Sequence, residues 1–161
     1  MDTLKIKTVK PDDKDDILEV YRQCEDFLTL GPQPKASLEM VIKDIDDAYN
    51  EGGVFQGIYI SGKIIGVVSY IRKGFEDKLS NAFISLLMII PPFRKKGIGT
   101  KIVNTVEKEI FMDKRVTTIL TAVQVNNPEA LRFWERNGYH IGGGPVTRPD
   151  GTTVFQLRRN R

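Results

Sequence analysis

The spacing of apolar residues along the chain changes several times between alternation, typical of strands, and a repeat of three or four residues, typical of helices. Residues 4–9 alternate apolar and polar side chains, which predicts a strand buried on one face. Helices are predicted after Pro11, over residues 37–49, from about Ile98 and from Pro128. Further strands are predicted at residues 54–60, 63–71, 82–90, 117–125, 139–141 and 154–157. The predicted order is therefore β–α–α–β–β–β–α–β–α–β–β.

Residues 86–100 combine a strand, a basic loop and the start of a helix. Residues 86–90 are all apolar, as expected of a strand covered on both faces, and two prolines end that strand. The loop at 94–99 reads Arg-Lys-Lys-Gly-Ile-Gly, and its glycines let backbone N–H groups approach a ligand closely. The first N–H groups of a helix have no partner within it. These N–H groups, the positive end of the helix dipole and the three cations of the loop together attract an anion. The stretch predicts a pyrophosphate site.

Two segments carry a resemblance to a known family. The loop at 94–99 resembles the Arg/Gln-x-x-Gly-x-Gly/Ala loop of the GCN5-related N-acetyltransferase (GNAT) superfamily. Residues 127–139, Asn-Pro-Glu-Ala-Leu-Arg-Phe-Trp-Glu-Arg-Asn-Gly-Tyr, resemble the family's Asn-x-x-Ala-x-x-Phe-Tyr-Glu-Lys-x-Gly-Phe segment. The predicted order of elements is also that of the family, and it spans nearly the whole chain. The resemblance implies an α/β (α+β) fold with a mixed, mostly antiparallel central sheet flanked by helices, and a single N-acetyltransferase domain over residues 1–161.

The resemblance implies acetyl transfer from acetyl-coenzyme A (acetyl-CoA) to an amine by direct attack on the thioester. In this family the strand before the loop separates from its parallel neighbour at a bulge, and the pantetheine arm fills the gap. Backbone groups of the strand would pair with pantetheine and polarise the acetyl carbonyl, and the loop would hold the pyrophosphate. Arg94 would either contact the cofactor or fix the loop. The implied cofactor residues are Met88, Ile89, Ile90, Arg94, Lys95, Lys96, Gly97, Ile98, Gly99, Thr100, Asn127 and Trp134.

The catalytic acid and base are not evident from the sequence. Trp134 stands where many members of the family have a tyrosine, and an indole N–H is a donor but not a usable acid. Ser85 occupies the strand that carries a glutamate base in some members, and Glu25 and Asp26 lie near the end of the first predicted helix. These three are weak candidates for the base. A non-catalytic acyl-CoA sensor with the same fold therefore stays open as an alternative.

Composition narrows the other classes of function. With one cysteine, Cys24, and one histidine, an internal disulfide, a zinc site and a Cys–His catalytic pair are all disfavoured, and we expect no metal and a reducing cytoplasm. No apolar run approaches the roughly 20 residues of a membrane helix, and the N-terminal residues do not resemble a signal peptide. No aromatic-interleaved basic stripe supports nucleic-acid binding, and the arginines at 158, 159 and 161 are expected to be solvated.

Charge is distributed unevenly along the chain. The net charge is +3, but residues 1–53 hold 7 Lys/Arg and 13 Asp/Glu, whereas residues 54–161 hold 17 and 8. We predict that the acidic part attracts a cationic acceptor such as a polyamine, an aminoglycoside, or a peptide or protein amine. The alternative is two solvated surfaces without a role. The sequence does not distinguish a monomer from a homodimer.

Overall fold

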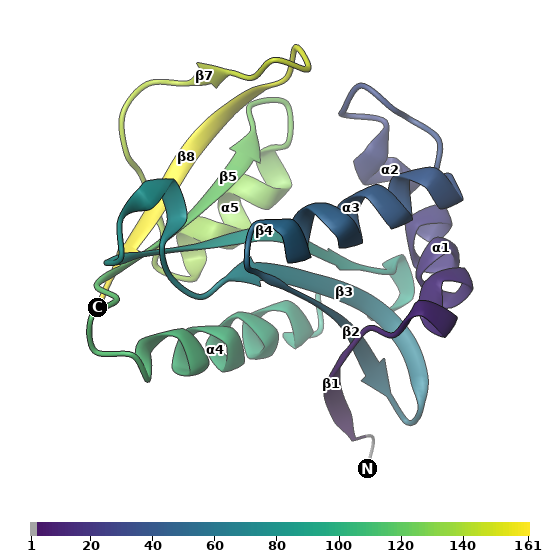
Figure 1. Ribbon diagram of the computed structural model, residues 1–161. Coiled ribbons are helices and arrows are strands. Elements are labelled where there is room, and N and C mark those ends of the chain that lie inside the picture. Colours follow the sequence, from purple (N-terminus) through teal and green to yellow (C-terminus); the bar gives the residue numbers. More distant parts are fainter. Residues whose placement is uncertain (1–2) are drawn as a thin grey trace.

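A computed structural model describes residues 3–161 as one mixed sheet with helices on both sides (Figure 1). The strands are β1 Leu4–Thr8, β2 Val54–Ile60, β3 Lys63–Ile71, β4 Asn81–Ile89, β5 Thr118–Gln124, β6 His140–Ile141, β7 Val146–Thr147 and β8 Thr153–Asn160. The helices are α1 Lys14–Gln23, α2 Glu25–Leu28, α3 Leu38–Asn50, α4 Ile98–Phe111 and α5 Pro128–Arg136, and short 3-10 turns lie at η1 Pro11–Asp13, η2 Phe75–Asp77 and η3 Pro91–Phe93. The first two residues of the N-terminal segment, for which no signal peptide is expected, lie outside the described residues.

The sheet has the strand order β1-β2-β3-β4-β5-β8-β6, with β7 also paired to β8. Only β4 and β5 are parallel, because α4 connects them as a crossover, and every other pairing is antiparallel. Figure 1 shows α3 and α4 on opposite sides of the middle strands. The predicted fold class, a mixed and mostly antiparallel sheet flanked by helices, is confirmed.

The structure adds two short elements to the predicted order. Helix α2 is a single turn, and β7 is two residues long, so neither has enough residues to display a period. Strand β8 extends three residues beyond the predicted end, through polar residues that pair with β5. Tyr139, predicted to begin a strand, instead lies fully buried in the core just before β6.

Two buried polar pairs join helices to the core. The hydroxyl of Tyr21 on α1 donates to Asp44 on α3 at 2.7 Å, and that of Tyr139 donates to Glu107 on α4 at 2.8 Å. Burial raises the pKa of the Asp44 and Glu107 carboxyls. The apolar stripe of α4, predicted from its helical spacing, is buried against the sheet at Ile102, Val106 and Ile110.

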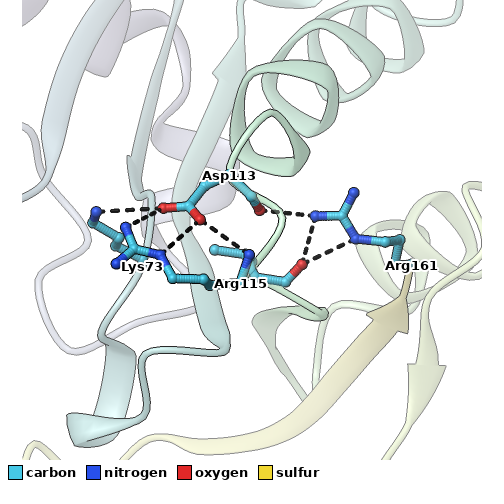
Figure 2. A network of polar contacts seen from close by, with 5 residues as sticks. Lys73, Asp113, Arg115 and Arg161 are labelled. Atoms are coloured by element: carbon cyan, nitrogen blue, oxygen red, sulfur yellow. Dashed lines mark hydrogen bonds and ion pairs between the residues drawn. The ribbon is translucent and has the colours of Figure 1, made fainter.

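A polar network holds the last residue of the chain (Figure 2). The guanidinium of Arg161 donates to the backbone carbonyls of Phe111, Asp113 and Val116, which belong to the end of α4 and the segment after it. The Asp113 carboxylate in turn binds Lys73 and Arg115, and the Arg115 guanidinium holds the pKa of that carboxyl well below its usual range. The expectation that the C-terminal arginines are simply solvated is therefore wrong for Arg161, and also for Arg159, whose guanidinium donates to the Asn137 carbonyl at 2.9 Å and pairs with the Glu107 carboxylate.

Candidate functional site

Strands β4 and β5 separate halfway along their length. They pair only over residues 81–84 of β4 and 118–121 of β5, yet β4 continues to Ile89 and β5 to Gln124. The register of β4 against β3 shifts at the same point, so Ser85 is an extra residue without a partner in β3. The Thr121 hydroxyl donates to the Ile84 carbonyl at 2.9 Å and closes the last paired position. Beyond it, one edge of β4 has no strand beside it.

A cavity of about 770 Å³ lies between this separated end of β4, the loop after it and α5. Nine of the twelve residues implied by the family resemblance line this cavity: Met88, Ile89, Arg94, Lys95, Gly97, Gly99, Thr100, Asn127 and Trp134. The other three, Ile90, Lys96 and Ile98, do not. Leu86, Leu87 and Ile89 are only partly buried, in contrast to the expected strand covered on both faces, and the cavity explains this for Leu87 and Ile89, which line it.

The edge of β4 that faces the gap is defined by its hydrogen bonding to β3. The N–H of Ile90 donates to the carbonyl of Ile65 at 2.9 Å, so Ile90 has no free donor. Because an antiparallel ladder alternates, the N–H groups of Leu87 and Ile89 point away from β3, toward the unpaired edge. The free donors therefore belong to Leu87 and Ile89, whereas the sequence analysis implicated Met88, Ile89 and Ile90.

The loop before α4 takes its shape from two left-handed residues. Lys95 has φ +60°, and Gly97, the N-cap of α4, has φ +80°, a conformation that favours glycine. The N–H of Lys101 bonds to the Gly97 carbonyl, so the preceding three N–H groups at the start of the helix have no acceptor within it. Gly99 also has a packing role, since a Cβ there would lie 2.9 Å from the Phe133 ring of α5, and its expected close approach to a ligand stays a prediction.

Arg94 is bound to the protein and fixes the loop. Its Nε donates to the Ile89 carbonyl at 2.7 Å, and its two terminal nitrogens bind the Asp26 carboxylate of α2 at 2.5 and 3.1 Å. The hydrogen bond from Arg94 lowers the pKa of Asp26, which makes that carboxylate a poorer base. The Cys24 thiol also donates to the Ile89 carbonyl, at 3.6 Å, and burial raises its pKa.

The remaining candidates for acid and base are also occupied. The Glu25 carboxylate accepts the backbone N–H of Ala36 at 2.7 Å, and the Ser85 hydroxyl donates to the Ser69 carbonyl at 3.0 Å. Neither Glu25 nor Asp26 is therefore a merely solvated helix end. Trp134 is buried with its ring edge-to-face against Phe133 and Tyr139, and the Tyr139 hydroxyl is directed to Glu107.

Several residues that line the cavity had not been identified from the sequence. Phe27 and Leu30 come from α2 and the loop after it, Phe93 from the turn before the basic loop, and Arg132 and Arg136 from α5. The two arginines are spaced i, i+4 on one helix, next to the second family segment, and this spacing was the signal that could have revealed them. The aromatic and leucine residues carried no such signal, since only the tertiary fold brings them to the cavity.

Residues in the described part of the chain offer two further negative findings. Among residues 3–161, no helix is both long and apolar enough to cross a bilayer. Within the same range, histidine, cysteine and acidic side chains nowhere gather in a group of three or more that could hold a metal ion.

Comparison with known proteins agrees with this geometry. The sequence profile of the acetyltransferase (GNAT) family matches residues 15–139. The kanamycin resistance protein of Rhizobium radiobacter is 38% identical over 86 residues, which is 53% of this chain and 70% of that protein. The thialysine N-epsilon-acetyltransferase of Mus musculus is 23% identical over 168 aligned positions, covering 98% of this chain and 94% of the mouse enzyme.

Solved structures show the same fold. The structure of AAC(6')-Ib in complex with ribostamycin and coenzyme A matches with a TM-score of 0.80 and 21% identity, over 99% of this chain and 94% of that one. Spermidine N-acetyltransferase from Vibrio cholerae, in complex with CoA and spermine, matches with a TM-score of 0.73 and 17% identity, over 98% of this chain and 95% of that one. With most of its length matched by the family profile, this chain belongs to the acetyltransferase (GNAT) family.

Proposed function

We propose that this protein transfers the acetyl group of acetyl-CoA to an amine acceptor, with residues 1–161 acting as one domain. The observation that carries the proposal is that one cavity joins the unpaired edge of β4 to the N-terminus of α4. The first can pair with an extended amide-containing arm, and the second can bind a pyrophosphate. Coenzyme A contains both groups at opposite ends of one molecule.

In this arrangement the pyrophosphate lies on the free N–H groups of Ile98, Gly99 and Thr100. Lys95 and the two arginines of α5, Arg132 and Arg136, add positive charge around the same cavity. Arg94 acts indirectly by holding the loop. The pantetheine arm runs along the N–H groups of Leu87 and Ile89, where the sequence analysis had placed Ile90. Asn127 uses its side-chain oxygen to cap α5 through the N–H of Ala130, which leaves its amide N–H₂ to donate to the arm.

The transfer step needs little from side chains. The lone pair of the amine attacks the thioester carbonyl carbon, and the carbonyl oxygen becomes an oxyanion that a β4 backbone N–H stabilises. The carbon–sulfur bond then breaks, the sulfur keeps the electron pair as a thiolate, and the attacking nitrogen loses its extra proton to water. Since every side chain considered as a base is bound elsewhere, we attribute the rate mainly to holding the amine and thioester in contact.

We propose that the acceptor is cationic. Exposed acids on α1 and α3, among them Asp15, Asp16, Asp46 and Asp47, lie on helices that pack against β2 and β3. One relative is named for kanamycin resistance and one structural neighbour for spermidine N-acetylation, and since both compounds are polycationic amines, these names support the same class of acceptor for this chain.

Thiol release from acetyl-CoA, measured with a panel of amines, tests this proposal. The panel contains spermidine, kanamycin, a lysine-containing peptide, and neutral or anionic primary amines. Amine-dependent release with the cationic members supports the proposal, and turnover confined to neutral or anionic amines would overturn the choice of acceptor.

The same assay separates an enzyme from a non-catalytic acyl-CoA sensor. Trp134, buried where relatives supply a phenol, and the occupied base candidates favour the sensor to some extent. Tight acetyl-CoA binding without amine-dependent thiol release from any member of the panel would select the sensor.

A further inference from the structure

Gln124, the last residue of β5, contains a buried oxygen without a hydrogen-bond partner. Among residues 3–161, Oε1 of Gln124 is the one buried side-chain nitrogen or oxygen that has no hydrogen-bond partner. Buried polar groups in native proteins are nearly always bonded, so an exception indicates a partner that the free chain does not supply. An amide oxygen accepts hydrogen bonds, so the absent partner is an N–H or O–H donor.

The position of Gln124 on β5 decides which ligand can reach it. Side chains of a strand alternate between faces, and paired residues of neighbouring strands share a face. Arg159, the β8 partner of Ile119, contacts Glu107 of α4, so odd-numbered residues of β5 face α4. Gln124 therefore lies on the opposite face, away from the start of α4 where the pyrophosphate is proposed to bind.

On that face the separated ends of β4 and β5 are partly exposed. The contacts of α1 and α3 fall on β2 and β3, whereas Ala122 of β5 and Ser85 of β4 keep access to solvent. A molecule that approached the thioester from this side would meet Gln124 at the end of β5.

The loop between α2 and α3 lies against the same amide. A Cβ at Gly31 would lie 3.3 Å from Nε2 of Gln124, so the glycine makes room for the side chain. The side chain of Asn126 donates to the carbonyl of Leu30 at 3.2 Å, and Leu30 also lines the cofactor cavity. The amide of Gln124 thus lies next to a loop that lines the cavity, with its nitrogen toward Gly31 and its oxygen without a hydrogen-bond partner.

We propose that Gln124 is a specificity-determining residue whose side-chain oxygen accepts a hydrogen bond from the nitrogen of the acetyl acceptor. The inference rests on the proposed acetyl transfer and assigns one contact on its acceptor side. An amide oxygen suits an ammonium or amine N–H, and it adds affinity without adding charge. No covalent role is assigned to Gln124.

The test compares Gln124→Met with the wild-type protein, using as probe the amine with the highest kcat/KM in the panel above. Methionine has a similar length but offers no comparable acceptor. We expect KM for the amine to rise about tenfold, as for loss of one hydrogen bond, whereas the Kd for acetyl-CoA measured by calorimetry stays unchanged. Because the substitution removes an unbonded polar atom, the Tm should not fall.

Two further variants control this experiment. Gln56→Met makes the same change at another half-buried strand residue, whose Oε1 already accepts a hydrogen bond from the Tyr70 hydroxyl. This variant should not raise the Tm or alter KM for the amine. Gln124→Glu keeps an oxygen acceptor and should hold KM for a cationic amine at or below the wild-type value.

An unchanged KM for the amine in Gln124→Met would overturn the inference. Turnover by the wild-type protein would still support the proposed function in that case. A rise in the Kd for acetyl-CoA would overturn it as well, because the partner would then be the cofactor. A lower Tm with unaltered kinetics would assign Gln124 a purely structural role. If the wild-type protein neither bound acetyl-CoA nor acetylated any amine, the proposed function would fail, and this inference with it.

Discussion

Single residues around the cavity are already bound to one another, and these bonds decide which of them can act on a ligand. Arg94 belongs to the family's loop motif, yet its guanidinium is bound by Asp26 and by the Ile89 carbonyl. The positive charge available to an anion therefore comes from Lys95 and from α5. Arg94 instead connects α2 to the end of β4, so α2 helps to set the position of the cofactor loop.

Replacing Asp26 by asparagine tests this connection. We expect KM for acetyl-CoA to rise by up to about fivefold, the size expected of a largely exposed ion pair, with little change in kcat. Steady-state kinetics at varied acetyl-CoA measures it, and Asp46→Asn, an exposed acid of α3, serves as the control. Equal KM values in Asp26→Asn and wild type would contradict the view that Asp26 fixes the loop through Arg94.

Glu107 predicts a dependence of stability on pH. Burial raises its folded pKa above the unfolded value of about 4.3, so the folded state binds more protons between these two values. The contribution of Glu107 is therefore full below the unfolded pKa and is lost as the pH rises through the folded pKa. Glu107→Gln keeps an oxygen for the Tyr139 hydroxyl but does not titrate.

Chemical denaturation of wild type and Glu107→Gln from about pH 4 to about pH 7 tests that sign. The free energy of unfolding of the wild type, minus that of the variant, should decrease as the pH rises. A difference that stayed constant or increased over this range would show that burial does not penalise the charged carboxylate.

At the scale of elements, the proposed site for the pyrophosphate consists of the loop at residues 94–97 and the first turn of α4. Gly97→Glu should raise the Kd for acetyl-CoA at least tenfold, a cost of about 1.4 kcal/mol, because a carboxylate is placed beside the proposed pyrophosphate. Gly97→Ala carries the same penalty for φ +80° without the charge, since a Cβ there meets no atom within 4 Å. Calorimetry on both variants separates the two effects, and equal weakening would assign the loss to backbone conformation instead.

One partly buried hydrogen bond joins α1 to α3. Tyr21→Phe should lower the free energy of unfolding by about 1–3 kcal/mol, because the Asp44 carboxyl loses its donor inside the protein. Tyr49→Phe is the matched control, since that hydroxyl donates to Val9 at 3.5 Å from a residue that is 44% exposed. Denaturant titration measures both, and a similar small loss in each variant would argue against a structural role for the pair.

The sequence predicted most elements because their signals are local. Strands β2 and β3 have the predicted bounds, since two mostly apolar runs flank a turn at Ser61 and Gly62. The loop at residues 94–97 and the start of α4 were also predicted, because the family motif is continuous in sequence, and the role of these residues in binding a cofactor stays a prediction. The remaining features depend on tertiary contacts. No local pattern shows that Arg94 is bound by Asp26, or that Ile90 uses its N–H on β3.

For the whole molecule, the uneven charge coincides with the two sides of the sheet. Exposed acids lie on α1 and α3, whereas the basic loop leads into α4, and Figure 1 shows α3 and α4 on opposite sides of the middle strands. The gap between β4 and β5 lies between these sides. This arrangement suits a reaction in which an anionic cofactor and a cationic amine approach a single thioester from opposite directions.

Calorimetric titration of the wild-type protein with acetyl-CoA is the strictest test of the proposal that the cavity binds this cofactor. We expect saturable binding of acetyl-CoA to one site per chain, with a Kd in the range of about 1 μM to 1 mM that is typical of enzyme substrates. We also expect clearly weaker binding of S-acetylpantetheine, which keeps the arm and lacks the pyrophosphate. Titration that produced no heat, accompanied by no rise in Tm with acetyl-CoA, would contradict the assignment of the cavity as the cofactor site.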